Sequence, residues 1–283
     1  MAWFQQEFIL GPKFTLTGGL RYDDDSEYGS ETSPKLSAVF AASEKTRLRA
    51  SFGHGFRAPR FGELFIDLGF FFVGNPDLKP ETSDSLTAGF TYVGDRVKAS
   101  IDYFDTELDN AIVFDFSGFP FGPITYRNIP GISTRQGFNT ELAVDLPGGF
   151  TPSIAYTKLD AEDDNGENIG GTAEDTAFFK LLWQDPGRGL RANLRAEYRS
   201  EETPGTTDGS YTPSYTLWNL QASKSLEAGG RKFRVWARVD NLTDESDIFR
   251  RDSTGAPIPG ELQVWEDGRN FHVGVAIDIE RGQ

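Results

Sequence analysis

Residues 190–198 read LRANLRAEY, and this short stretch decides the fold class of the chain. Every second side chain from Leu190 to Tyr198 is apolar or aromatic, and the positions between them are Arg, Asn, Arg and Glu. A period of two with one apolar face predicts a β-strand that separates two different environments. The segments 97–103 and 233–239 alternate in the same way. We therefore predict an all-β protein.

The same pattern recurs along the whole chain, and no helical period competes with it. We predict about 13 strands, at residues 2–10, 14–22, 34–42, 46–56, 83–93, 96–108, 133–145, 150–160, 176–185, 190–200, 215–226, 232–242 and 270–279. Successive strands joined by turns are expected to pair as an antiparallel meander.

The connections between these strands sort by length. Tight turns such as Gly11-Pro12 and Gly94-Asp95 alternate with long connections. The long connections are 23–33, 57–82, 109–132, 161–175, 201–214 and 243–269. Short turns at one rim and long loops at the other are typical of a transmembrane β-barrel, and strands of ~9–11 residues match a tilted membrane crossing. A soluble β-structured module is the alternative, although soluble strands are usually shorter, about 5–6 residues.

The composition limits the function classes. The 283 residues carry a formal net charge of -15, which argues against a nucleic-acid partner because phosphate binding needs clustered Lys and Arg. The chain has no cysteine, which excludes disulfides, thiolate zinc sites and a cysteine nucleophile. No apolar run approaches the ~20 residues that a membrane-spanning helix needs.

Three longer motifs follow one another along the chain: SFGHGFRAP at 51–59, GNPDLKPE at 74–81 and DNLTD at 240–244. In this order they give a sequence that resembles the TonB-dependent outer-membrane receptors. Shorter matches to the same family lie at 4–6, 17–23, 102–104, 137–142 and 268–271. The resemblance therefore covers nearly the whole chain.

The resemblance implies that residues 1–283 are a single domain, the C-terminal portion of a plugged barrel of about 22 strands in the outer membrane. It implies uptake of a ferric siderophore, another metal chelate or a cobalamin-like ligand. The TonB complex would act through a plug domain that this chain does not show. The odd strand count also places Met1 at the outer rim, as expected of a chain that lacks an N-terminal part.

Two alternatives stay open beside this reading. The chain forms a self-standing small outer-membrane pore or binding protein of about 12–14 strands, or it is the soluble module described above. An enzyme is not expected, because His54 and His272 are the only histidines and neither has a defensible nucleophile partner by spacing. We predict no cofactor and no metal site, since the acidic segment 160–167 departs from the EF-hand pattern.

The long connections contain the candidate ligand-binding residues. They are aromatic and Arg side chains on the same rim, where exposed aromatic clusters need a reason. The candidates are Arg57, Arg60, Phe70, Phe71, Phe72, Phe119, Phe121, Tyr126, Arg250, Arg251 and Trp265. The alternative for Phe70–Phe72 is packing inside a folded loop. The prolines of GNPDLKPET restrict the backbone, so a structural role is expected there.

The polar face of the strands contains a second candidate set. The residues expected to line the lumen are Arg47, Arg49, Lys98, Asp102, Glu141, Arg191, Arg195, Glu197, Arg234 and Arg238. These charges either form ordinary ion pairs along the wall or contact a plug or an anionic ligand. Substitutions that face the lumen tune selectivity, which would separate the two roles.

Overall fold

Thirteen strands pair in the order in which they occur along the chain, within the residues that the structure describes. The computed structural model describes residues 1–25, 29–115, 117–118, 121–129, 131–203, 209–228, 231–245, 248–264 and 268–278. The strands of the sheet are β1 (Ala2–Leu10), β2 (Phe14–Asp25), β3 (Gly29–Ala41), β4 (Thr46–Arg57), β5 (Glu81–Val93), β6 (Val97–Asp109), β9 (Ile132–Val144), β10 (Phe150–Glu162), β11 (Asp175–Asp185), β12 (Leu190–Arg199), β13 (Tyr215–Ala228), β14 (Arg231–Asp240) and β17 (Asn270–Asp278). Each predicted strand is present, and the antiparallel meander is confirmed.

The long connections contain further elements that the alternation did not predict. A short helix, α1 (Phe61–Phe65), follows β4. The hairpin of β7 (Ile112–Asp115) and β8 (Thr125–Asn128) follows β6, and the hairpin of β15 (Ile248–Arg251) and β16 (Pro257–Val264) follows β14. A single 3₁₀ turn, η1 (Pro186–Arg188), joins β11 to β12. No helix in the described part of the chain is long and apolar enough to cross a membrane.

The long connection predicted at 23–33 is wrong. β2 continues to Asp25 and β3 begins at Gly29, and the two strands pair with Asp23 opposite Glu31. This stretch reads DDDSEYGSETS and is polar on both faces, so it shows no alternation although its backbone pairing continues. Residues 26–28 lie outside the described residues.

The chain divides into two compact units. The first comprises residues 1–90, 102–137 and 160–168, and the second comprises 91–101, 138–159 and 169–283. Both units are built from antiparallel strands of the same sheet.

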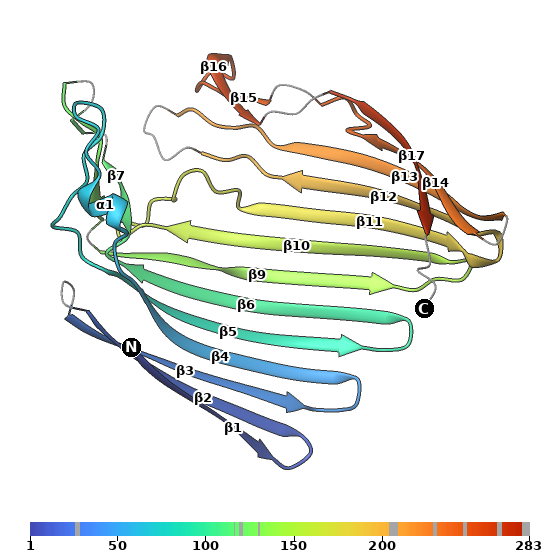
Figure 1. Ribbon diagram of the computed structural model, residues 1–283, viewed down its shortest axis with the longest axis horizontal. Coiled ribbons are helices and arrows are strands. Elements are labelled where there is room, and N and C mark those ends of the chain that lie inside the picture. The colour runs from blue at the N-terminus through green and yellow to red at the C-terminus, as the bar shows by residue number, and fades with distance from the viewer. Residues whose placement is uncertain are drawn as a thin grey trace. The chain divides into compact units, whose positions relative to one another are not determined.

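In the first unit, β1 to β4 lie side by side (Figure 1). The register gathers apolar side chains on one face: Phe4 stands opposite Leu20 and Phe8 opposite Leu16. The same face continues through pairs such as Phe14–Phe40, Phe40–Leu48 and Leu36–Phe52. Arg49 stands opposite Val39 on the other face, because successive strand residues point to opposite sides.

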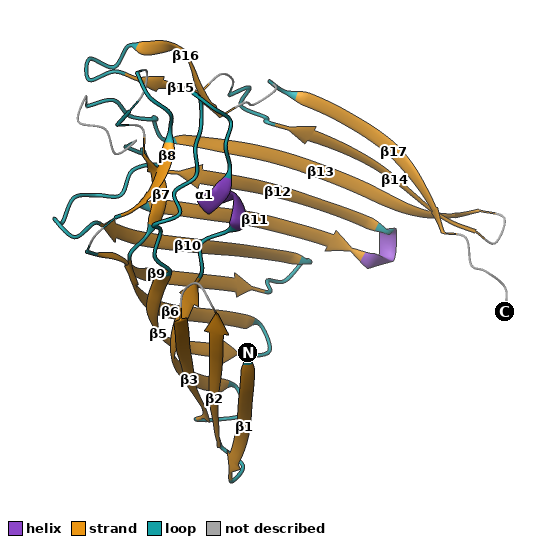
Figure 2. Ribbon diagram, turned by 60° about the vertical axis from the view of Figure 1, so that its left-hand side comes forward, coloured by secondary structure: helices purple, strands orange, loops and turns teal. Residues whose placement is uncertain are grey.

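In the second unit, β11 to β14 also lie side by side (Figure 2). Leu194 pairs with Leu181 and Leu220, while Arg195 pairs with Lys180 and Asn219 on the opposite face. The apolar face extends to β17, where Val273 and Val275 are 82% and 63% exposed. A continuous exposed apolar face of this kind needs apolar surroundings.

Candidate functional site

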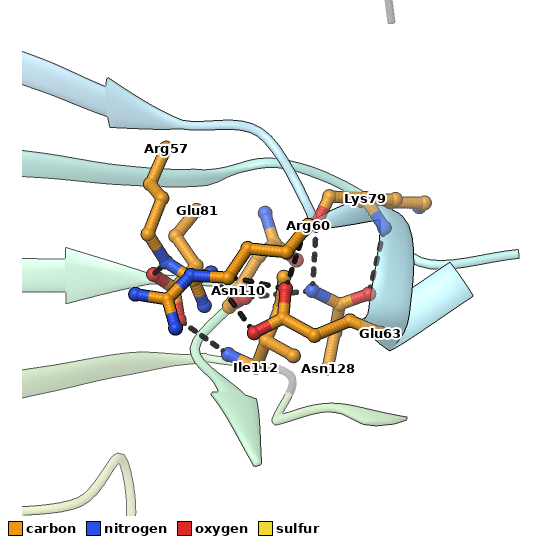
Figure 3. A network of polar contacts seen from close by, with 8 residues as sticks. All are labelled: Arg57, Arg60, Glu63, Lys79, Glu81, Asn110, Ile112 and Asn128. Carbon is orange, nitrogen blue, oxygen red and sulfur yellow. Dashed lines mark hydrogen bonds and ion pairs between the residues drawn. The ribbon is translucent and has the colours of Figure 1, made fainter. Parts of the chain in front are cut away.

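Arg57 organises the connection between β4 and β5 in the first unit. Its guanidinium donates from Nε to Glu81 Oε2 at 2.5 Å, and from Nη1 to both carboxylate oxygens of Glu63 at 3.0 and 3.1 Å (Figure 3). The side chains of Glu63 and Glu81 are only 12% and 13% exposed. A hydrogen bond to a charged group contributes about 1.5–3 kcal/mol, less here because Arg57 is 36% exposed and water screens part of it.

Glu81 and Glu63 extend this network to neighbouring segments. The second oxygen of Glu81 accepts the backbone N–H of Ile112, at the start of β7, at 2.6 Å. Glu63, in α1, accepts the backbone N–H of Arg60 at 2.7 Å. The charges at the ends of β4 and β5 therefore hold both α1 and the β7–β8 hairpin (Figure 3). We call the contacts among residues 57–81 and 110–128 the loop clasp.

Two asparagines add a second layer to the loop clasp. Asn75 donates from Nδ2 to the carbonyl of Tyr126 at 2.9 Å, and its Oδ1 accepts the N–H of Asp77. Asn128 accepts the N–H of Lys79 at 2.8 Å and donates to the carbonyls of Lys79 and Asn110. The side-chain amides thus satisfy backbone groups of two connections at once. The GNPDLKPE segment therefore joins the connection after β4 to the connection after β6.

A small apolar core supports the same segment. Leu64 of α1 and Leu78 are buried, at 7% and 4% exposure. Gly74 lies so close to α1 that a Cβ there would be 2.6 Å from the carbonyl carbon and oxygen of Leu64. The N–H of Asn75 then donates to the carbonyl of Glu63 at 2.8 Å. Only glycine permits this approach of two backbones.

The aromatic candidates divide into a packed and an exposed group. Phe72 and Tyr126 pack with Phe114, with ring centroids 4.8 to 5.8 Å apart, and such pairs contribute about 0.5–1.5 kcal/mol each. Phe70 and Phe71 are 56% and 72% exposed. Phe72 is therefore packed inside the folded connection, whereas a ligand-binding role for the exposed rings of Phe70 and Phe71 stays a prediction.

Other aromatic side chains complete this inventory. Phe121 is 93% exposed, and Phe61 and Phe65 of α1 are 78% and 53% exposed, with their rings 5.1 Å apart. Phe61 and Phe65 were not among the predicted site residues, although their i, i+4 spacing places both on one side of a helical turn. Phe119 and Trp265 lie outside the described residues. Exposed rings available to a ligand in the first unit thus include Phe70, Phe71 and Phe121.

In the second unit, the predicted candidates Arg250 and Arg251 take part in contacts between two other connections. Arg250 donates from Nε to Oγ of Ser210 at 2.9 Å, and Ser210 is 3% exposed. Arg251 and Tyr211 exchange two backbone hydrogen bonds of 2.7 and 2.8 Å. The side chain of Arg251 also donates to the carbonyl of Gly255. These contacts pin the connection 201–214 to the β15–β16 hairpin.

The DNLTD motif forms the turn that leaves β14. Asn241 has a positive φ of 52° and is 3% exposed. Its side-chain amide donates to the carbonyl and accepts from the N–H of Glu245. Asp244 accepts the N–H of Arg269 at 2.7 Å. Asn tolerates the left-handed region better than other side chains, so the motif supplies both the bend and its hydrogen bonds.

Several predicted lumen residues meet on the polar face of the strands. In the first unit, Arg49 donates from Nε to Asp102 at 2.8 Å, over Gly89 of the intervening strand, where any side chain would collide with the pair. In the second unit, Arg238 and His272 both contact Asp240, at 2.6 and 3.3 Å.

The remaining members of this set share the polar face but do not all meet. Lys98 and Glu141 line a hollow of about 260 Å³ together with Ser100, Ser153 and Phe178. Arg191, Arg195 and Glu197 alternate with apolar residues on β12, and Arg234 pairs with Ser225 and Ala276. Arg47 pairs with Ala41, and Arg49, two residues later on the same strand, pairs with Val39. That this face lines a lumen stays a prediction.

The acidic segment 160–167 forms a turn stabilised by its own carboxylate. Asp163 Oδ1 accepts the N–H groups of Glu167 and Asn165, both at 2.9 Å. These hydrogen bonds hold the pKa of the Asp163 carboxyl below its ordinary value. The carboxylate thus has a structural role at neutral pH.

Comparison with known proteins gives one family. The model of the family described as TonB dependent receptor-like, beta-barrel matches residues 2–242. The iron-regulated outer membrane virulence protein of Vibrio cholerae is 26% identical over 300 residues, covering 98% of this chain and 44% of that protein. The vitamin B12 transporter BtuB of Vibrio vulnificus is 29% identical over 254 residues, covering 89% of this chain and 39% of that protein.

A solved structure shows the same fold. A mutant of the ferric enterobactin receptor PfeA of Pseudomonas aeruginosa, in complex with enterobactin, superposes with a TM-score of 0.80 at 22% identity. The match covers 96% of this chain and 44% of that chain. The present chain therefore spans less than half the length of the relatives that it matches.

The family match covers most of the chain, and the antiparallel meander with its two-faced strands agrees with it. The named relatives include an outer-membrane protein of Vibrio cholerae. The chain therefore belongs to the TonB-dependent receptor β-barrel family and is an outer-membrane β-barrel protein.

Proposed function

We propose that the chain forms part of the barrel wall and the ligand-facing loops of a receptor that takes up a ferric siderophore or a cobalamin-like ligand. The loop clasp carries this proposal, because it fixes a long connection and leaves Phe70 and Phe71 exposed at 56% and 72%. Rigid exposed rings offer large contact area to flat or conjugated groups of a ligand at little entropic cost. The proposed role is transport and not catalysis.

The relatives support both ligand classes. One is named a vitamin B12 transporter, and a structural neighbour is a ferric enterobactin receptor. In this proposal, residues 1–283 form one barrel domain. The remaining strands, the plug and the contact with TonB would belong to other parts of a receptor as long as the relatives. The apolar faces of the strands would contact outer-membrane lipid, as outward-facing barrel residues do.

Equilibrium binding of ferric enterobactin and of cyanocobalamin to the detergent-purified receptor tests this function. We expect one of the two to bind, and Phe71→Ala to weaken its binding by about tenfold, which corresponds to loss of a stacking contact of about 1.4 kcal/mol. Phe40→Ala is the matched control. The Phe40 side chain is 40% exposed and lies near the end of β3, beside a short turn and not in a long connection. Phe40→Ala should leave the affinity unchanged.

Two results would contradict the proposal. Binding of neither probe would remove the proposed ligand classes, and an equal loss in both variants would remove the role of the Phe71 ring. Conductance in planar bilayers adds a further check, because an open channel without ligand dependence would favour the small-pore alternative.

A further inference from the structure

We propose that Arg57 is a positioning residue that locks the connection after β4 and the β7–β8 hairpin into one rigid body. This coupling would also fix the position of the Phe71 ring for the ligand, and that consequence rests on the proposed function. The coupling itself rests on the geometry of the loop clasp alone. Arg57 would therefore act through Glu81 and Glu63 without touching the ligand.

Contacts between the two connections occur at three levels. At the base, Arg57 holds Glu81, whose second oxygen accepts the N–H of Ile112. In the middle, the side-chain amides of Asn75 and Asn128 join backbone groups of both connections. The hairpin is thus tied to the connection after β4 near its start and near its end.

The third level lies next to the exposed rings. Ile124 donates its N–H to the carbonyl of Phe71 at 3.1 Å and accepts the N–H of Val73 at 3.0 Å. The ring of Phe72, between them in sequence, packs against Tyr126 of β8 at 5.2 Å. A movement of the hairpin would therefore move Phe71 with it.

Arg57 is the residue on which this coupling depends. It is the donor that neutralises both Glu63 and Glu81, and these carboxylates are largely shielded from water. Without Arg57 the two carboxylates would lose the cation that contacts both of them, and only the charge of Arg135 would still act on Glu81, which is costly in a shielded site. Lysine is a poorer replacement, because its ammonium lacks the planar fork that directs separate N–H groups at two carboxylates in fixed directions.

Hydrogen–deuterium exchange of the detergent-purified full receptor tests the coupling without any ligand. Arg57→Lys and Glu81→Gln should each raise the exchange rates of amides in both 61–75 and 112–128 by about tenfold, because both connections open together. Arg60→Ala is the matched control: Arg60 is an exposed neighbour whose backbone N–H makes the contact with Glu63. It should leave both segments unchanged.

Three outcomes would overturn the proposal: no change in the hairpin in either variant, loosening of only one connection, or equal loosening in Arg60→Ala. A distance measurement gives an independent check, because the chain has no cysteine. Spin labels introduced by Phe70→Cys and Phe121→Cys should give a narrow distance distribution that broadens when Arg57→Lys is added. An unchanged distribution would contradict rigid coupling.

Hydrogen–deuterium exchange and ligand binding, measured on the same variants, separate this inference from the proposed function. Phe71→Ala should leave the exchange of both connections unchanged and weaken binding of ferric enterobactin or cyanocobalamin. Intact coupling with no binding of either probe would refute the ligand proposal alone. Binding with independent loosening of the two connections would refute the positioning role alone.

Discussion

At the scale of single residues, the loop clasp depends on shape as much as on charge. Gly74 brings the backbone after Phe72 against α1, and the space that a side chain would need is filled by backbone atoms of Leu64 and Phe65. Backbone atoms cannot rotate away as a flexible side chain can. The position therefore requires glycine for a steric reason that the GNPDLKPE motif alone does not reveal.

Gly74→Ala should open the loop clasp. The added Cβ would force α1 away and break the hydrogen bond from Asn75 N–H to Glu63, at a cost of about 1–3 kcal/mol. Protease nicking within 61–75 should accelerate, as measured by mass spectrometry. Gly62→Ala is the control, because a Cβ at Gly62 in α1 meets no neighbouring atom within 4 Å; equal nicking in both variants would contradict the account.

At the scale of elements, the connections are folded structures with their own hydrogen bonds. The turn at Asn241 shows how a motif carries one of them: the residue adopts a positive φ and its amide satisfies both backbone groups of Glu245. Its own N–H donates to Asn219 of β13 at 3.0 Å. The turn thereby fixes where the connection leaves the sheet.

Replacement of Asn241 should separate the two contributions of this turn. Asn241→Gly keeps the backbone conformation and loses the side-chain bonds, whereas Asn241→Ala also places a Cβ in the left-handed region. We expect a loss of about 1–3 kcal/mol for glycine and about 1 kcal/mol more for alanine. Thermal unfolding in detergent measures both; equal stability of the alanine variant and the unmodified protein would refute this role.

The sequence predicted the strands well and the connections poorly, for physical reasons. Alternation over nine or more residues identifies a two-faced strand, as in Leu190–Arg199. The four-residue strands β7 and β8 are too short to show a period. The polar ends of β2 and β3 pair through their backbones, and backbone pairing produces no alternation of polar and apolar side chains.

The candidate site was predictable only in part. The sequence left packing and exposure both open for Phe70–Phe72, because the three rings look identical in sequence. The packing of Phe72 depends on Phe114 and Tyr126. The loop clasp joins Arg57, Glu81 and Ile112, which lie far apart along the chain. Contacts of this kind follow from topology, and no local pattern indicates them.

Across the whole molecule, we expect one face of the strands to contact lipid and the other to face a polar interior. β12 is the best place to test it, because its neighbours β11 and β13 are paired in full register on both sides. The chain has no native cysteine, so single cysteine labels can be introduced without first replacing any native residue.

The most direct measurement is a nitroxide scan of β12 in reconstituted membranes, one label at a time, through Ala192→Cys, Asn193→Cys, Leu194→Cys and Arg195→Cys. We expect labels at 192 and 194 to collide mainly with oxygen dissolved in lipid. Labels at 193 and 195 should collide mainly with a water-soluble nickel reagent, giving a period of two. Access of the nickel reagent to all four positions, without a period of two, would contradict a membrane-spanning wall.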